Sequence, residues 1–156
     1  MPPAVQLDPR FRWALYAAFS TLFVTGVAWL STDRLKDSAN GETWQAVSAS
    51  LLTIHGGATM VTLLLLGALF PVHIQRIWRT RKNRATGTVM VIFNVILIAT
   101  AFGLYYAGSD TLRPWISDLH IAAGLFLPPL ILTHVIVGRR SRRTEKRRRI
   151  RIAEPT

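Results

Sequence analysis

Apolar residues along the chain are gathered into four long blocks, which are separated by short polar segments. The blocks run roughly over residues 11–30, 46–78, 86–107 and 114–138. Each contains at least the roughly 20 residues that an α-helix needs to cross about 30 Å of hydrocarbon. The core of a water-soluble domain of 156 residues does not need such continuous apolar runs. The pattern therefore predicts an all-α integral membrane protein, an up-down four-helix bundle.

The first block shares one feature with a secretory signal, because Arg10 and Arg12 precede an apolar run. The run is longer than the about 7 to 15 apolar residues of such signals, and its exit, VAWLSTDRL, offers no clean small-x-small cleavage site. We expect a membrane anchor here, with a cleaved signal as the alternative.

Positive charge is distributed unequally between the ends of the predicted helices. Cations precede the first block, surround the connection between the second and third blocks, and fill the tail RRSRRTEKRRRIR, whereas the other two connections carry three cations and several carboxylates. Because short cytoplasmic segments are enriched in Lys and Arg, both termini are expected on the cytoplasmic side of a bacterial inner membrane. An even number of spans agrees with this orientation.

The basic tail suggests two kinds of partner. Nine cations in thirteen residues would attract the phosphates of a nucleic acid. The tail directly follows a predicted span, however, where such clusters commonly fix topology and contact anionic lipid head groups. We therefore predict one membrane domain over residues 1–140 and a basic cytoplasmic tail over residues 141–156, with lipid and no nucleic acid as its partner.

Four histidines are present, and all lie within the second and fourth blocks. His55 and His73 are 18 residues apart, and His120 and His134 are 14 residues apart. At about 100° per residue, the first spacing returns to the same helical face and the second misses it by about 40°. Ionisable side chains within a span are costly and usually functional. Each helix is therefore expected to present two imidazoles on one side, at two depths.

The depths of the histidines suggest how they pair. His73 and His134 lie six and five residues before the arginines that border the cytoplasmic side, whereas His55 and His120 belong to the outer half. Because the second and fourth helices run in the same direction, we pair His55 with His120 and His73 with His134. The two levels are separated by about 21 to 27 Å along the bundle, which is too far for one shared ion.

Two separate sites with one imidazole from either helix suit two macrocycles. The chain has no cysteine, which excludes a disulfide, a thiolate-held iron–sulfur cluster and a covalently attached c-type haem. Bis-histidine ligation then predicts two non-covalent haem b groups between the second and fourth helices. The alternatives are a single haem, or histidines that serve in packing or in a proton relay.

The histidine spacings differ by four residues, or about 6 Å of helical rise. Straight parallel helices would therefore not bring the two histidines of both pairs to the same depth. Pro71, Pro128 and Pro129 are placed to absorb this difference, because proline frees a backbone carbonyl and bends a helix. Glycines at 56, 57, 67 and 124 would let a flat macrocycle approach the backbone, although glycines also mediate ordinary helix packing in membranes.

Several other polar residues are candidates for supporting roles. Arg113, with Trp115, is a candidate for the propionates of the outer haem, and Arg76 and Arg79 for those of the inner haem. Snorkelling towards the interface is the alternative for each arginine.

The first and third blocks contain no histidine, but they do contain polar side chains. Thr21, Thr25 and Asn94 could hydrogen-bond to neighbouring helices or to the second nitrogen of a ligand imidazole, with packing as the expected role.

With these histidines, the chain resembles the bacterial b-type cytochromes that have four transmembrane helices, including small dihaem cytochromes b and the cytochrome b subunits of membrane hydrogenases and formate dehydrogenases. The similarity covers about residues 11–140 and rests on IHGGATMVTLLLLGALFPVHIQRIW and DLHIAAGLFLPPLILTHVIVGRR. In the cytochrome b of quinol:cytochrome c oxidoreductases, two helices each supply two histidines about fourteen residues apart. His120 and His134 match that spacing, whereas His55 and His73 depart from it by four, which argues against a close relative of that enzyme.

The resemblance implies transmembrane electron transfer between quinone in the bilayer and a periplasmic redox protein or dehydrogenase subunit. We expect an electron-transfer subunit without a catalytic residue of its own. A self-contained quinol-linked oxidoreductase acting on superoxide or a ferric chelate is the second hypothesis. A haem-free membrane anchor or proton-relay bundle is the third.

Overall fold

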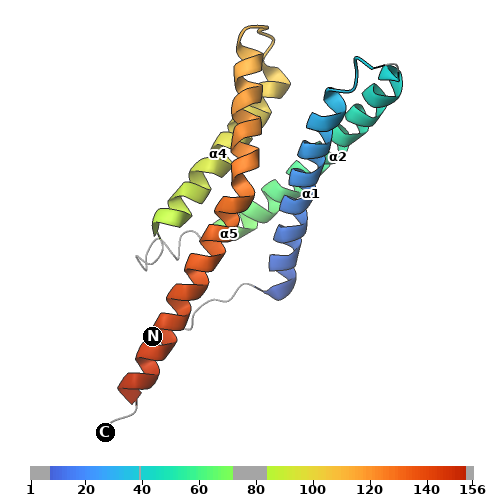
Figure 1. The fold of residues 1–156 in the computed structure, drawn as a ribbon. Helices are drawn as coiled ribbons and strands as arrows, with labels where there is room; N and C mark the ends of the chain where they lie inside the picture. Colours follow the sequence, from blue (N-terminus) through green and yellow to red (C-terminus); the bar gives the residue numbers. More distant parts are fainter. Residues whose placement is uncertain (1–7, 39, 72–83, 154–156) are drawn as a thin grey trace. The chain divides into compact units, whose positions relative to one another are not determined.

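The computed structural model describes residues 8–38, 40–71 and 84–153, and four helices account for most of them (Figure 1). These helices are α1 (Pro9–Asp33), α2 (Gly41–Leu69), α4 (Arg84–Tyr106) and α5 (Leu112–Ala153). Each is long and apolar enough to cross a membrane. The prediction of an all-helical chain with four candidate spans is confirmed.

The helices form two antiparallel hairpins, α1 with α2 and α4 with α5 (Figure 1). Each hairpin belongs to its own compact unit, Met1–Arg76 for the first and Ile77–Thr156 for the second. Short connections, over residues 34–40 and 107–111, force consecutive helices to reverse direction and lie side by side. The up-down order of the helices within each hairpin follows from these connections.

A side-chain cap sets the beginning of α1, and a glycine sets that of α2. The Asp8 carboxylate accepts a hydrogen bond of 2.7 Å from the backbone N–H of Arg10, and Pro9 occupies the first turn, where its missing N–H has no cost. α2 begins directly after the first connection, at Gly41. A Cβ at this position would collide with the carbonyl oxygen of Lys36, so the tight turn requires glycine.

The first hairpin is joined along rows of residues that repeat every seven positions. Thr32 Oγ1 lies 2.8 Å from Ser48 Oγ, and seven residues further from the turn Thr25 Oγ1 lies 2.9 Å from His55 Nδ1. Ala18 and Thr62, which are also buried, continue the same two rows by another seven residues. A seven-residue repeat keeps one face of each helix against its partner, as in coiled coils and helical bundles.

In the second hairpin, the contacts between the helices also repeat at multiples of seven residues. Thr100 Oγ1 lies 2.8 Å from His120 Nδ1, and fourteen residues further along each helix Thr86 Oγ1 lies 3.2 Å from His134 Nδ1. Leu127, midway between the two histidines, is buried. The contact row of α5 is therefore 120, 127 and 134.

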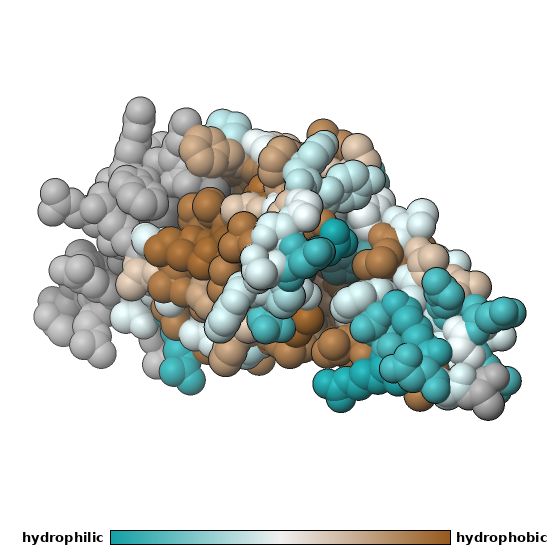
Figure 2. Space-filling view, turned by 90° about the horizontal axis from the view of Figure 1, so that it is seen from above, coloured by the Kyte–Doolittle hydropathy of each residue, from teal (hydrophilic) through white to brown (hydrophobic). Residues whose placement is uncertain are grey.

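Small and polar side chains, rather than large apolar ones, fill the interior of the hairpins. Of the nine buried residues in the described part of the chain, five are threonine or serine. Large apolar side chains such as Leu64 (76% exposed) and Phe102 (66%) lie outside, and Figure 2 shows apolar surface open to the surroundings. Water-soluble proteins have the opposite distribution, whereas helices in lipid pack through small residues. The burial pattern thus supports a membrane location independently of hydropathy.

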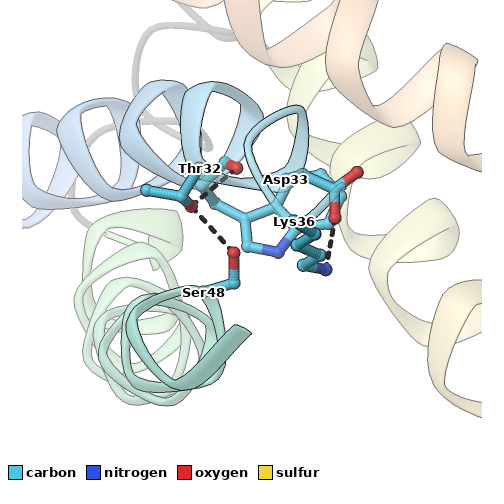
Figure 3. A network of polar contacts seen from close by, with 5 residues as sticks. Thr32, Asp33, Lys36 and Ser48 are labelled. Carbon is cyan, nitrogen blue, oxygen red and sulfur yellow. Dashed lines mark hydrogen bonds and ion pairs between the residues drawn. The ribbon is translucent and has the colours of Figure 1, made fainter. Parts of the chain in front are cut away.

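The turn of the first hairpin carries a polar network (Figure 3). Thr32 Oγ1 donates to the carbonyl oxygen of Trp29 at 3.0 Å, so its one proton is used there and the hydroxyl of Ser48 donates to Thr32. Ser48 is only 2% exposed. Asp33 and Lys36 form an ion pair next to this contact. Both hydroxyls are satisfied at the point where α1 and α2 approach closely.

The helix α5 continues without interruption through Pro128 and Pro129 and extends past the predicted end of the fourth span. The two prolines cannot donate to the carbonyls of Gly124 and Leu125, which weakens the helix on one side. Figure 1 shows that α5 remains one helix but changes direction part way along its length. The candidate span ends at Ser141, and residues 142–153 continue the helix for about 18 Å.

We expect Ser48→Leu to destabilise the first hairpin, because the leucine would have to enter the most buried position between α1 and α2. Overpacking of this kind costs about 1–3 kcal/mol. The free energy of unfolding in detergent micelles measures the effect. Ser50→Leu is the matched control, because Ser50 is exposed on the same helix and bonds only to the carbonyl of Ala46. Equal stability of the two variants would contradict the proposed packing.

Candidate functional site

Three of the four predicted histidine ligands lie in the described part of the chain, and a threonine of the neighbouring helix contacts each of them. The pairs are His55 with Thr25, His120 with Thr100, and His134 with Thr86. In all three, the hydrogen bond involves Nδ1 of the imidazole. The remaining predicted residues, His73, Arg76 and Arg79, lie outside the described residues.

The His55 imidazole is half-buried between α1 and α2. Its Nδ1 lies 2.9 Å from Thr25 Oγ1, and the next residue of α1 is Gly26. A Cβ at Gly26 would lie 3.5 Å from Cε1 of His55, an ordinary van der Waals contact. The backbone of α1 therefore lies against the ring, and together with the hydroxyl it limits how the imidazole can rotate.

The other two imidazoles project from α5 towards α4. His120 and His134 are both half-buried, and both bond to threonines of α4, so they lie on the same face of α5. At about 1.5 Å per residue they are about 21 Å apart along the helix. The second hairpin thus presents two equivalent imidazoles at two depths.

Gly103 lets α4 and α5 approach closely beside the Thr100–His120 pair. A Cβ at Gly103 would lie 3.3 Å from two carbon atoms of Ile116, and a Cβ at Gly124 would lie 3.9 Å from Cδ2 of Leu97. The contact at Gly124 is an ordinary van der Waals contact that an alanine could also make. At Gly56, Gly57 and Gly67, a Cβ would meet no atom of the described residues within 4 Å.

Arg113 and Trp115 lie in the first turns of α5, and both side chains are exposed. Arg113 precedes His120 by seven residues, so it shares a helical face with His120 and His134. The distance along the helix from Arg113 to His120 is about 10 Å. This arrangement places a cation on the histidine face of α5, beyond His120 on the side away from His134.

Three polar residues of the first and third spans were suggested by the sequence as histidine partners, and among the described residues Thr25 is the one that contacts a histidine. Thr21 donates to the carbonyl of Ala17, and Asn94 donates to the carbonyl of Met90, each within its own helix. Thr86 and Thr100 were not predicted. Their signal is present in the sequence, because they are fourteen residues apart, like His120 and His134, on the opposite side of a short turn.

The chemistry of this site is that of single, oriented imidazoles. Among the described residues, no three side chains of His, Asp or Glu come together as a cluster that could hold a metal ion. A bis-histidine haem needs only one imidazole on each side of its iron, and the porphyrin supplies the other four ligands. The donor set therefore fits axial ligation of a macrocycle better than chelation of a bare ion.

No protein-family model, curated protein or solved structure matches the chain. Its function must therefore be argued from its own residues.

We expect Gly26→Leu to push the imidazole of His55 away from Thr25 and to cost about 1–3 kcal/mol of stability, because a bulky side chain would occupy the volume of the ring. Gly26→Ala should be neutral or stabilising by up to about 1 kcal/mol, since its Cβ makes only ordinary contact and alanine favours a helix. Unfolding of both variants in micelles measures this difference. A leucine that is tolerated as well as alanine would contradict the contact.

Proposed function

We propose that this protein is a b-type membrane cytochrome that carries electrons through two bis-histidine haems between the quinone pool and a periplasmic redox partner. The sequence pairs His55 with His120 for the outer haem and His73 with His134 for the inner one. A haem iron with two imidazole ligands accepts and releases single electrons without binding a further ligand. The protein residues would hold, orient and separate the two groups.

One observation carries this proposal: each described histidine is held at Nδ1 by a threonine hydroxyl from the neighbouring helix. A histidine that binds a metal almost always uses its other ring nitrogen in such a bond, because that bond fixes the orientation of the ring. The three contacts are therefore of the kind that axial ligands require. In each of them Nε2 is the ring nitrogen that would face the iron.

The second hairpin also supplies a suitable spacing. His120 and His134 lie on one face of α5, about 21 Å apart, which accommodates two separate macrocycles. Arg113 on the same face is a candidate partner for the propionates of the outer haem, with Trp115 next to the same helix end. For the inner haem, Arg76 and Arg79 are the corresponding candidates from the sequence.

A haem-free role has support from the same contacts. Each Thr–His hydrogen bond joins the two helices of a hairpin, and such bonds contribute about 0.6 kcal/mol on average to helix association in membranes. In this second candidate function, the histidines only hold the helices together or relay protons. Haem content separates the two functions directly.

The purified chain should contain two haems, counted by the pyridine haemochrome method, with a low-spin reduced spectrum. His120→Ala and His134→Ala should each remove about one haem per chain, because each deletes an axial ligand. Asn94→Leu is the control, since it removes a polar group of the third span that, among the described residues, bonds to the carbonyl of Met90 in its own helix. A wild-type chain without haem, or with only high-spin haem, would contradict the proposal and favour the haem-free role.

We further propose that both termini lie in the cytoplasm of a bacterial cell, with the connections over residues 34–40 and 107–111 on the periplasmic side. Because the chain has no cysteine, single cysteines report on each side without interference. A membrane-impermeant thiol reagent added to intact spheroplasts should label Ser38→Cys and Ser109→Cys but leave Thr144→Cys unlabelled. The reverse labelling pattern would overturn the orientation.

A further inference from the structure

The Thr25 hydroxyl has its single proton committed within its own helix. Thr25 Oγ1 lies 2.7 Å from the carbonyl oxygen of Thr21 and 3.2 Å from that of Leu22. A carbonyl oxygen can only accept, so at 2.7 Å the hydroxyl proton must lie between the two oxygens. Towards His55 Nδ1, at 2.9 Å, Thr25 can then offer only a lone pair.

The Thr100 hydroxyl repeats this arrangement in the second hairpin. Its Oγ1 lies 2.7 Å from the carbonyl oxygen of Ile96 and 3.1 Å from that of Leu97, and it lies 2.8 Å from His120 Nδ1. The two hydroxyls are alike in burial, because Thr25 is 6% exposed and Thr100 is 7% exposed. His55 and His120, which lie in different hairpins, therefore each face a threonine oxygen that can only accept a hydrogen bond.

A ring nitrogen that faces an acceptor at hydrogen-bond distance must carry a proton. We infer that Thr25 and Thr100 set the tautomer of His55 and His120, with the proton on Nδ1 and the lone pair on Nε2. Neutral imidazole has one N–H and one acceptor nitrogen, so fixing the first also fixes the second. Both threonines are thus positioning residues, which prepare Nε2 of each histidine as the electron-pair donor.

Under the proposed function, on which this consequence rests, the arrangement removes two costs of binding haem. An imidazole must present an unprotonated nitrogen to iron, and its ring must be held in a suitable orientation. A threonine that has already used its proton selects the correct tautomer before any iron is present. Loss of such supporting contacts typically weakens metal binding by about 10- to 100-fold.

The chain offers a matched control for the two threonines. Thr62 is 5% exposed on α2 and donates to the carbonyl of Ala58, as Thr25 and Thr100 donate to carbonyls of their own helices. Thr62→Val therefore reports the general effect of replacing a buried hydroxyl in these hairpins. Thr25→Ser and Thr100→Ser keep the hydroxyl while they change the side-chain shape.

The tautomer can be measured without haem. Solid-state ¹⁵N NMR of the full-length, haem-depleted chain with labelled histidine, reconstituted in lipid bilayers, distinguishes protonated from unprotonated ring nitrogens. We expect an Nδ1–H signal with unprotonated Nε2 for His55 and His120, kept in the serine variants and in Thr62→Val. Thr25→Val and Thr100→Val should each shift the corresponding histidine towards the Nε2–H form. A wild-type Nε2–H form, or tautomers unchanged by valine, would overturn the inference.

Haem binding then tests the functional consequence. Thr25→Val and Thr100→Val should each weaken retention of the outer haem by about 10- to 100-fold, whereas the serine variants and Thr62→Val should stay within a few-fold of wild type. Unchanged retention in the valine variants would show that the tautomer does not position a ligand. If the wild-type chain binds no haem, the proposed function fails, whereas the NMR measurement still decides whether the threonines set the tautomers.

Discussion

Helices that are surrounded by hydrocarbon gain little by burying apolar side chains against each other, because lipid tails are as apolar as leucine. Close packing and hydrogen bonds must then hold them together. The two hairpins largely follow this constraint: apart from Leu15 and Leu127, the buried residues described are threonine, serine and alanine, three histidines are half-buried, and many large apolar side chains face outwards. The seven-residue spacing of the polar contacts follows as well, since only that repeat keeps one narrow face of each helix on its partner.

The same constraint explains why threonine is the partner of each of the three described histidines. A hydroxyl inside a membrane helix needs an acceptor, and the carbonyl one turn earlier is the nearest one. Threonine can reach it from a preferred rotamer, and its oxygen still has a lone pair for a neighbouring helix. The side chain therefore satisfies itself and a histidine at the same time, which an apolar residue of the same shape could not do.

Much of the fold could be predicted from the sequence, because four apolar blocks of membrane-spanning length have few other uses. The residues at which the helices begin and end could not be predicted in this way. α2 begins at Gly41, five residues before the apolar block, because backbone hydrogen bonds do not depend on hydropathy and Glu42 suits the first turn. The continuation of α5 to Ala153 was missed for the same reason, since no proline or glycine interrupts residues 139–153.

The candidate site was predicted in part. Histidines within apolar blocks were conspicuous, and the helical period put His120 and His134 near one face. Thr86 and Thr100 escaped notice because periodicity within one helix says nothing about which residues face it from another. That information lies in the length of the turn over residues 107–111, which sets the register of α4 against α5.

The seven-residue register of the hairpins also limits how their lengths can change during evolution. A single residue inserted between His120 and His134 would rotate one histidine by about 100° relative to the other and remove it from the face that meets α4. An insertion or deletion would keep both threonine contacts only if it leaves the two histidines near one helical face and is matched in α4 and α5. Changes in the length of α4 and α5 should therefore come in matched pairs, and the turn over residues 107–111, which sets the register between these helices, should keep its length.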